Sequence, residues 1–259
     1  MPHPDHEKNR AAWNEMVGIH YDHPDYRTKE FLDGTSKLMN IERKALGDVR
    51  GKQLLHLMCQ FGLDTLSWAR EGAIVTGVDI SDESIRRAEQ LSREAKLSAT
   101  FVRSDVLDLI GVIDQKFDIV FQSHGTYMWL SDLSAWGKVI AHYLKPGGVF
   151  FIADTHPSRP MFWDPPVSYF SYTPQRSVGE PDYCDRDYKI KHELVEWQHT
   201  MSEILNSLIE AGLTVERLDE YNKGFYAEEA DWVRQSDGYW TPPSGPTPYP
   251  LMFSVKARK

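Results

Sequence analysis

The chain has 259 residues, of which 41% are hydrophobic and 26% are charged, so it is long enough for one large globular domain with a substantial core. Its net charge of −9 and its lack of a dense lysine or arginine block argue against nucleic acid as a partner. Two cysteines are too few for a disulfide framework, and no apolar run reaches the roughly 18 residues that a membrane-spanning helix needs.

The N-terminal stretch MPHPDHEKNR is too polar for a signal peptide. We therefore expect a cytoplasmic enzyme with no nucleic-acid or membrane partner, and we predict no metal site. The sequence leaves the oligomeric state open, with a dimer among the possibilities.

Residues 1–50 carry weak helical patterns that the loop HYDHPDY, residues 20–26, interrupts. Aromatic side chains and histidines are frequent in this segment. A helical arm packed on the core explains them, as does a lid over an active site, and the two interpretations are compatible. We predict that residues 1–50 form an N-terminal helical arm or lid.

Residues 51–157 alternate between apolar runs and helical patterns. Helices are expected after Gly62, after a Ser81 cap and after a Ser131 cap, and the last of them stops at LKPGG, residues 144–148. Five βα units in sequence imply an α/β fold with a mostly parallel, doubly wound sheet and helices on both faces. The predicted strands are residues 53–58, 74–78, 100–103, 117–121 and 149–157.

The alternation breaks after residue 157. Residues 157–190 and 221–248 are rich in proline and aromatic side chains and have no helical period, which indicates a functional cover over the domain. We expect them to form an aromatic cap on a domain of residues 51–259. The remaining predicted elements are a strand at 189–197, a helix that begins with a Thr200–Glu203 capping box and ends at Gly212, and strands at 213–218 and 249–257 that suit an antiparallel C-terminal hairpin.

The stretch most informative about chemistry is LLHLMCQFG, residues 54–62, together with GVDIS, residues 77–81. A strand, a tight turn, a helix and a second strand that ends in an acid make the opening βαβ unit of a nucleotide-type fold. Met58 and Gln60 stand where two glycines are usual. A nicotinamide dehydrogenase is an alternative with the same opening, but its GxGxxG turn is absent here.

These motifs resemble the class I S-adenosylmethionine-dependent methyltransferases. The stretches LLHLMCQFGLDTLSWAR, GTYMWLSDLSAW and DTHP are similar to a bacterial subgroup of uncharacterised small-molecule methyltransferases with an altered first turn. The resemblance implies a Rossmann-like, seven-stranded, mostly parallel sheet with an antiparallel C-terminal hairpin, and S-adenosylmethionine as cofactor. The matching motifs are HLMCQFG at residues 56–62, GVDIS at 77–81, SDV at 104–106, FDIVFQSHG at 117–125 and LKPGG at 144–148.

The resemblance also implies roles for single residues. Asp79 would accept from the ribose hydroxyls, Asp105 from the adenine amino group, and Gln60 would bind the amino-acid portion. His56 stands where this family usually has an acid. The missing glycines are tolerable because this cofactor has no phosphate for the backbone to approach. Alternatively, Asp79 is a helix N-terminal carboxylate and Asp105 a solvated loop acid. The predicted cofactor-binding residues are His56, Met58, Cys59, Gln60, Gly62, Asp79, Ile80, Ser104, Asp105, Val106, Gln122, Ser123 and His124.

Methyl transfer from a sulfonium is a one-step, in-line displacement, so the protein chiefly orients the acceptor, excludes water and removes a proton where needed. His124 and His156 directly follow the fourth and fifth strands and are the catalytic candidates, although each also suits a structural loop histidine. We expect a small-molecule acceptor beneath the cap. The alternatives are a non-catalytic regulatory domain that binds the cofactor, and a protein methyltransferase. The predicted substrate-binding residues are Tyr21, Tyr127, Trp129, His156, Trp163 and Trp197.

Overall fold

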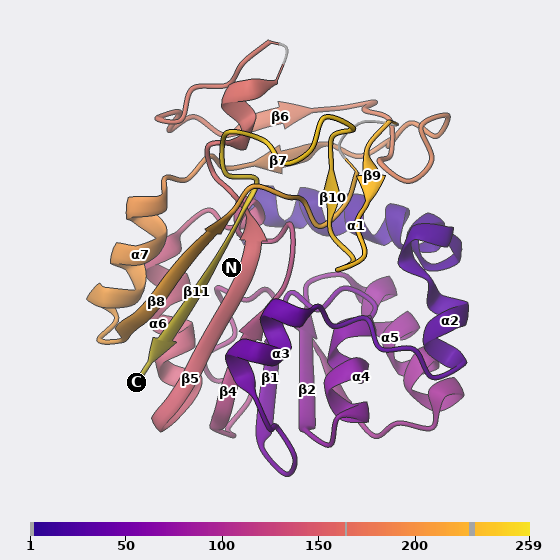
Figure 1. The fold of residues 1–259 in the computed structure, drawn as a ribbon. Helices are drawn as coiled ribbons and strands as arrows, with labels where there is room; N and C mark the ends of the chain where they lie inside the picture. The colour runs from indigo at the N-terminus through magenta and orange to yellow at the C-terminus, as the bar shows by residue number, and fades with distance from the viewer. Residues whose placement is uncertain (1–2, 164, 228–230) are drawn as a thin grey trace.

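A computed structural model describes residues 3–163, 165–227 and 231–259, so residues 1–2 of the expected arm and residues 164 and 228–230 of the expected cap lie outside the described residues. Within the described part, seven strands form one sheet in the order β3-β2-β1-β4-β5-β11-β8, in which only β11 runs antiparallel to its neighbours (Figure 1). This confirms the predicted Rossmann-like α/β fold with a C-terminal antiparallel hairpin. The strands are β1 (Gln53–Leu57), β2 (Ile74–Asp79), β3 (Thr100–Arg103), β4 (Phe117–Gln122), β5 (Leu144–Thr155), β8 (Thr214–Tyr221) and β11 (Met252–Arg258).

Helices cover both faces of this sheet because the central strands are buried on both sides. One apolar cluster joins the sheet to α3 and α4, and another joins α4 to α5 and the N-terminal helices. On the opposite face, Trp136 of α6 and Leu208 of α7 pack on Phe150 and Val255 of the sheet in the largest cluster. These helices are α3 (Asn40–Leu46), α4 (Leu63–Arg70), α5 (Asp82–Ala95), α6 (Leu133–Tyr143) and α7 (Met201–Glu210).

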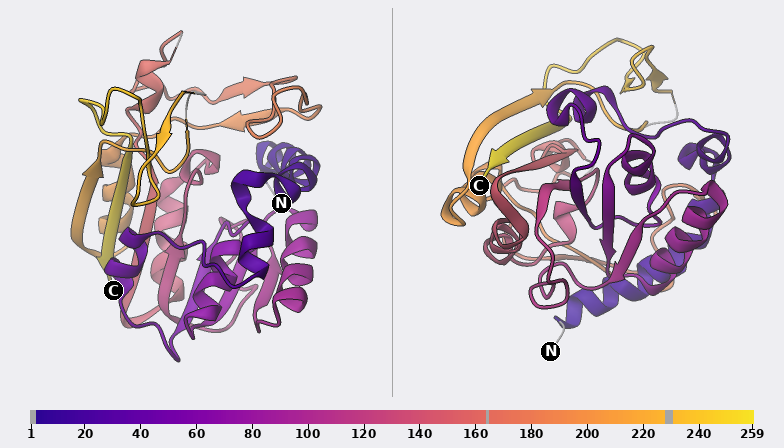
Figure 2. Two further views of the ribbon diagram at one scale, coloured as in Figure 1. Left: turned by 45° about the vertical axis from the view of Figure 1, so that its right-hand side comes forward. Right: turned by 90° about the horizontal axis from the view of Figure 1, so that it is seen from below.

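The N-terminal arm and the two proline-rich segments gather at the carboxyl end of the parallel strands (Figures 1 and 2). In open α/β sheets this end binds ligands. None of the described helices is both long enough and apolar enough to cross a membrane. The elements at this end are α1 (Pro4–Asp22), η1 (Pro24–Tyr26), α2 (Thr28–Leu32), η2 (Tyr127–Trp129), η3 (Arg159–Phe162), β6 (Gln175–Ser177), β7 (Leu194–Glu196), β9 (Val233–Arg234) and β10 (Trp240–Thr241).

Three sequence predictions about local structure were wrong. The cap of α6 is Asp132, whose side chain accepts from the amide of Ala135, rather than Ser131. The strand β5 already begins at Leu144, so the LKPGG turn belongs to an irregular strand rather than separating it from the helix. The strand expected at residues 189–197 is only β7, and it pairs with β6 in a small sheet of its own.

The contact between α6 and α7 depends on the absence of a side chain at Gly137. A Cβ at this position would lie 2.2 Å from the backbone oxygen of Ser207, and neither backbone can move without disturbing the core. We predict that Gly137→Ala lowers the free energy of unfolding by about 1–3 kcal/mol, measured by urea denaturation.

Gly18 in α1 supplies the matched control, because a Cβ there meets nothing within 4 Å. Gly18→Ala should raise the free energy of unfolding by about 0.5–1 kcal/mol, as expected for a glycine replaced within a helix. Equal effects of the two substitutions would contradict the packing argument.

Candidate active site

The turn between β1 and α4 keeps a left-handed backbone even where its glycines are missing. The φ angles are +56° at Met58, +49° at Gln60 and +80° at Gly62. Position 62 requires glycine, because a Cβ there would lie 2.8 Å from the ring of Phe101. Side chains with a Cβ adopt this conformation at a cost of about 1–2 kcal/mol each, and such strain is concentrated at functional sites. The turn therefore holds a left-handed backbone at two positions that carry side chains.

Asp79, at the carboxyl end of β2, holds this turn in place. Its Oδ2 accepts from the amide of Gln60 at 2.8 Å, and its Oδ1 accepts from the amide of Ser81 at 2.9 Å. Burial raises the pKa of Asp79 to about 6, although the backbone N–H groups act in the opposite direction. A carboxylate has about four lone-pair sites, so this group can accept further hydrogen bonds from a ligand.

His56 takes the position of the family's acid at the end of β1, but it does not take over its charge. Its Nδ1 lies 2.7 Å from the hydroxyl of Thr65 in α4, and its Nε2 lies 3.0 Å from the hydroxyl of Ser123 after β4. Burial lowers the pKa of His56 to about 4, so the ring is neutral near pH 7. Cys59 is also buried, and burial raises the pKa of its thiol, which argues against a nucleophile.

Asp154 of β5 holds the loop after β4 in place through hydrogen bonds. The buried Asp154 carboxylate accepts from the amides of Gly125 and Thr126 and from the Thr126 hydroxyl. His124 in this loop lies with its Nε2 3.1 Å from Oε1 of Glu42 in α3, and its ring packs against Phe225 at a tilt of 37°. Burial disfavours the charged ring, but the Glu42 carboxylate outweighs it and raises the pKa of His124.

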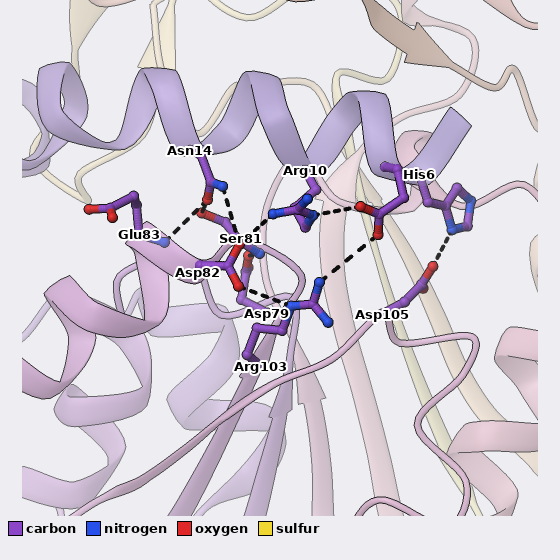
Figure 3. A network of polar contacts seen from close by, with 10 residues as sticks. His6, Arg10, Asn14, Asp79, Ser81, Asp82, Glu83, Arg103 and Asp105 are labelled. Carbon is purple, nitrogen blue, oxygen red and sulfur yellow. Dashed lines mark hydrogen bonds and ion pairs between the residues drawn. The ribbon is translucent and has the colours of Figure 1, made fainter. Parts of the chain in front are cut away.

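The helix α1 lies along the carboxyl ends of β3, β2 and β1 and contacts the loop after each of them. Nδ1 of His6 is 2.5 Å from Oδ2 of Asp105, which follows β3. Asn14 contacts the Ser81 hydroxyl, which follows β2, at 2.6 Å, and Arg10 pairs with Asp82 (Figure 3). Farther along α1, His20 approaches the turn after β1. The arm thus covers the row of loops that the sequence assigns to the cofactor.

At the far end of α1, side chains from three segments meet around His20. Its Nε2 lies 2.8 Å from Oδ2 of Asp182, from the segment 157–190, and both side chains are fully buried. Its Nδ1 lies 3.2 Å from the side-chain nitrogen of Gln60. With Cys184, His20 and Asp182 place one possible ligand atom each within 4.8 Å, the group of described residues whose side chains best suit a metal ion. In this structure the histidine and the carboxylate bond to each other.

A second group of predicted residues lines a small cavity above β4 and β5. The cavity measures about 30 Å³, which suits water rather than a substrate. His156 lines it, but Nδ1 of this ring is 2.6 Å from the Ser158 hydroxyl and Nε2 is 2.8 Å from Oε1 of Glu220. Both ring nitrogens of His156 are therefore engaged. The other predicted residues around the cavity are Tyr127, Trp163 and Trp197.

The structure brings the turn, Asp79 and Ile80, Ser104 and Asp105 together, but it leaves other predicted site residues elsewhere. Gln122 is fully buried and bonds to Thr126 and to the indole of Trp136 in α6. Val106 belongs to the core. Tyr21 packs on the far side of α1, against Phe61 and Arg87, and Trp129 donates to the carbonyl of Gly125.

Sequence reasoning missed His6, His20 and Asp182. The segment HYDHPDY did mark the region as rich in histidine and tyrosine. Adjacent helical residues point about 100° apart, so a helix that directs His20 at Gln60 directs Tyr21 at Phe61 and Arg87 instead. The sequence of residues 1–22 does predict a helix. Which face of this helix points inward depends on how the arm packs on the domain, and the sequence does not give that.

The strand order is that of the class I S-adenosylmethionine-dependent methyltransferase fold. Residues 55–152 match the family described as "Methyltransferase domain". The chain is 31% identical over 142 residues to an uncharacterized methyltransferase of Synechocystis sp., covering 54% of this chain and 64% of that protein. It is 32% identical over 109 residues to a ubiquinone biosynthesis O-methyltransferase of Coxiella burnetii, covering 40% of this chain and 44% of that protein.

Each of these matches spans less than two thirds of the relative's length. Among solved structures, an S-adenosylmethionine-dependent methyltransferase from Mesorhizobium loti is similar with a TM-score of 0.58 and 21% identity, covering 88% of this chain and 100% of that one. At this identity the likeness establishes the fold, and it agrees with the strand order described above.

The conformation of Gln60 gives a direct test of the turn. Gln60→Ala and Gln60→Gly both remove the side-chain amide and its 2.9 Å hydrogen bond to the Tyr26 hydroxyl, so they differ only in the Cβ. Because φ is +49°, we predict that the glycine variant is more stable than the alanine variant by about 1 kcal/mol, measured by urea denaturation.

Lys96, the left-handed C-cap of α5, supplies a reference for the same comparison at an ordinary position. There too, the glycine variant should be more stable than the alanine variant by a similar free energy of unfolding. An alanine variant at residue 60 that is as stable as the glycine variant would show that the turn does not hold a left-handed backbone in solution.

Proposed function

We propose that this protein transfers a methyl group from S-adenosylmethionine to a small-molecule acceptor by in-line displacement. The observation that supports this most is the left-handed turn of Met58, Gln60 and Gly62 fastened to the Asp79 carboxylate. Glycine would adopt this conformation without strain, so the two side chains are kept at an energetic cost. A site that keeps such strain is best explained by a ligand that uses the turn.

The residues at the three strand ends suit the chemistry of that cofactor. Asp79 offers lone pairs for ribose hydroxyls, and Asp105 offers a carboxylate for the adenine amino group. Nε2 of His6, beside Asp105, is buried and has no hydrogen-bond partner within the described residues, so an unsatisfied polar atom lies beside Asp105. The cofactor supplies an activated methyl group. The protein's part is to bind and orient the two reactants and to exclude water.

The choice of a small acceptor rests on what covers the loops after β1, β2 and β3. The helix α1 lies over the loops after β3 and β2, and Asp182 and Tyr183 of the segment 157–190 close its far end. We propose that residues 1–50 act as a lid and that residues 157–190 and 221–248 act as a cap. A site covered in this way suits a compact ligand better than an extended peptide. The Coxiella burnetii relative, named for ubiquinone biosynthesis, points the same way.

Cofactor binding is tested by calorimetric titration of S-adenosylhomocysteine. In Asp79→Ala, the ligand loses hydrogen bonds to a charged acceptor, so we predict that its affinity falls by about a hundredfold, corresponding to roughly 3 kcal/mol. Asp48→Ala is the matched control, because Asp48 is exposed and pairs only with Arg50 in the described structure.

The control should bind like the wild type. No binding to the wild-type protein would defeat the proposed function, whereas equal affinities of the wild type and Asp79→Ala would remove Asp79 from the site.

The raised pKa of Asp79 predicts how binding depends on pH. Ligand hydroxyls favour the ionised carboxylate, and in the free protein this group takes up a proton as the pH falls through about 6. Affinity, measured by calorimetry, should therefore be highest above pH 7 and fall about tenfold by pH 5. Binding at pH 6 should release a proton. An affinity that stays constant or rises over this range would contradict the assignment, and Asp79→Ala should lose the dependence.

A further inference from the structure

The cluster around His20 has the geometry of an oriented base. Its Nε2 lies 2.8 Å from Oδ2 of Asp182, and neither side chain has exposed surface. Oδ1 of Asp182 accepts from the amides of Cys184 and Asp185, so the carboxylate itself is fixed. An anchored carboxylate that accepts from one ring nitrogen fixes the tautomer and leaves the other nitrogen as the basic atom.

The neighbours of Nδ1 support the same tautomer. They are the side-chain nitrogen of Gln60 at 3.2 Å, the Tyr183 hydroxyl at 3.2 Å and the Tyr26 hydroxyl at 3.4 Å. Each is a possible donor. The two hydroxyls also bond to each other, so at most one of them donates to Nδ1. Burial raises the pKa of Tyr26 and of Tyr183, so both phenols keep their protons. Nδ1 therefore carries a lone pair directed at the side chain of the cofactor turn.

The geometry points to His20 as the general base that removes the proton of a hydroxyl acceptor, with Asp182 as its positioning residue. This inference rests on the proposed function. Of the two histidines that the sequence favoured, His156 has both ring nitrogens engaged. His124 is also oriented by a carboxylate, that of Glu42, but its ring lies against Phe225 rather than at the cofactor turn. At His20, by contrast, phenol hydroxyls already occupy the place that an acceptor hydroxyl would take.

The step balances without a further reactant. The acceptor proton moves to Nδ1 of His20, and the acceptor oxygen forms a bond to the methyl carbon as the carbon–sulfur bond breaks. The electron pair of that bond remains on sulfur and cancels the sulfonium charge. The Asp182 carboxylate compensates the charge of the protonated ring until the proton passes to solvent.

An acceptor can reach this nitrogen by displacing one side chain. Tyr183 is 52% exposed, while its hydroxyl lies at Nδ1, so its ring is the wall between His20 and solvent. The rings of Tyr26 and Trp13 form the other sides and offer apolar surface to an aromatic acceptor. The titratable groups that face the imidazole are Asp182, Tyr26, Tyr183 and Cys184.

The first test measures the ring directly. In ¹⁵N-labelled protein saturated with S-adenosylhomocysteine, two-dimensional NMR of the histidines should show His20 protonated at Nε2 and not at Nδ1 near pH 7.5. Catechol should perturb the Nδ1 signal, and benzene, which lacks a hydroxyl, should not. A proton on Nδ1, or an Nδ1 signal that catechol leaves unchanged, would overturn the assignment.

The second test measures transfer from methyl-tritiated S-adenosylmethionine to catechol. His20→Gln should reduce the rate constant about a hundredfold to ten-thousandfold while leaving the affinity for S-adenosylhomocysteine within about threefold of wild type. Asp182→Asn should reduce the rate and shift the acid limb of the pH–rate profile. His192→Gln is the control, since this exposed histidine pairs with Glu15 away from the site and should change neither quantity.

The outcomes of these tests distinguish the role of His20 from the proposed methyl transfer on which it rests. If the wild type fails to bind S-adenosylhomocysteine, the proposed function falls first. If it binds normally but His20→Gln retains the wild-type rate, or catechol accepts no methyl group, only the role of His20 falls. Stoichiometric zinc in the purified protein that is lost in both His20→Gln and Cys184→Ala would also overturn it, because His20 would then be a metal ligand.

Discussion

A hydrogen bond from the amide of Gln60 to the buried carboxylate of Asp79 connects the two halves of the opening βαβ unit. The turn after β1 has two side chains in a backbone conformation that favours glycine, and Asp79 is the group that secures it. Gly77 permits this closeness, because a Cβ there would lie 2.8 Å from the sulfur of Cys59. The cofactor site that we propose, and the contacts of the arm, are all arranged around this junction.

The side chains that replaced the glycines have acquired contacts of their own. Gln60 donates to Tyr26, in η1, and faces His20 of α1, so a residue that strains the turn also ties the arm to it. His56 likewise exchanges the usual acid for a neutral bridge between α4 and the loop after β4. At residue 60, side-chain hydrogen bonds replace the backbone freedom of a glycine. At residue 56, they replace a charge. The site is consequently more enclosed than a glycine-rich turn alone would make it.

Much of the fold could be predicted from the sequence, because each βα unit carries its own signals. The Ser81 and Thr200 caps act within a few residues and were confirmed. The placement of Asp79 beside the turn also follows from local order. The pairing of His20 with Asp182 did not follow, since it joins residues 162 positions apart through a segment without helical or strand period. Packing decides such contacts, and no short-range pattern reports them.

The central claim is that the strained turn, Asp79 and the arm form one ligand site. Hydrogen exchange measured by mass spectrometry, with and without S-adenosylhomocysteine, tests this most directly because it reports each segment at once. The account predicts that the ligand slows exchange in residues 58–62, in residues 79–82 and in α1 together. Protection confined to other segments, or protection of the turn without any change in α1, would contradict it.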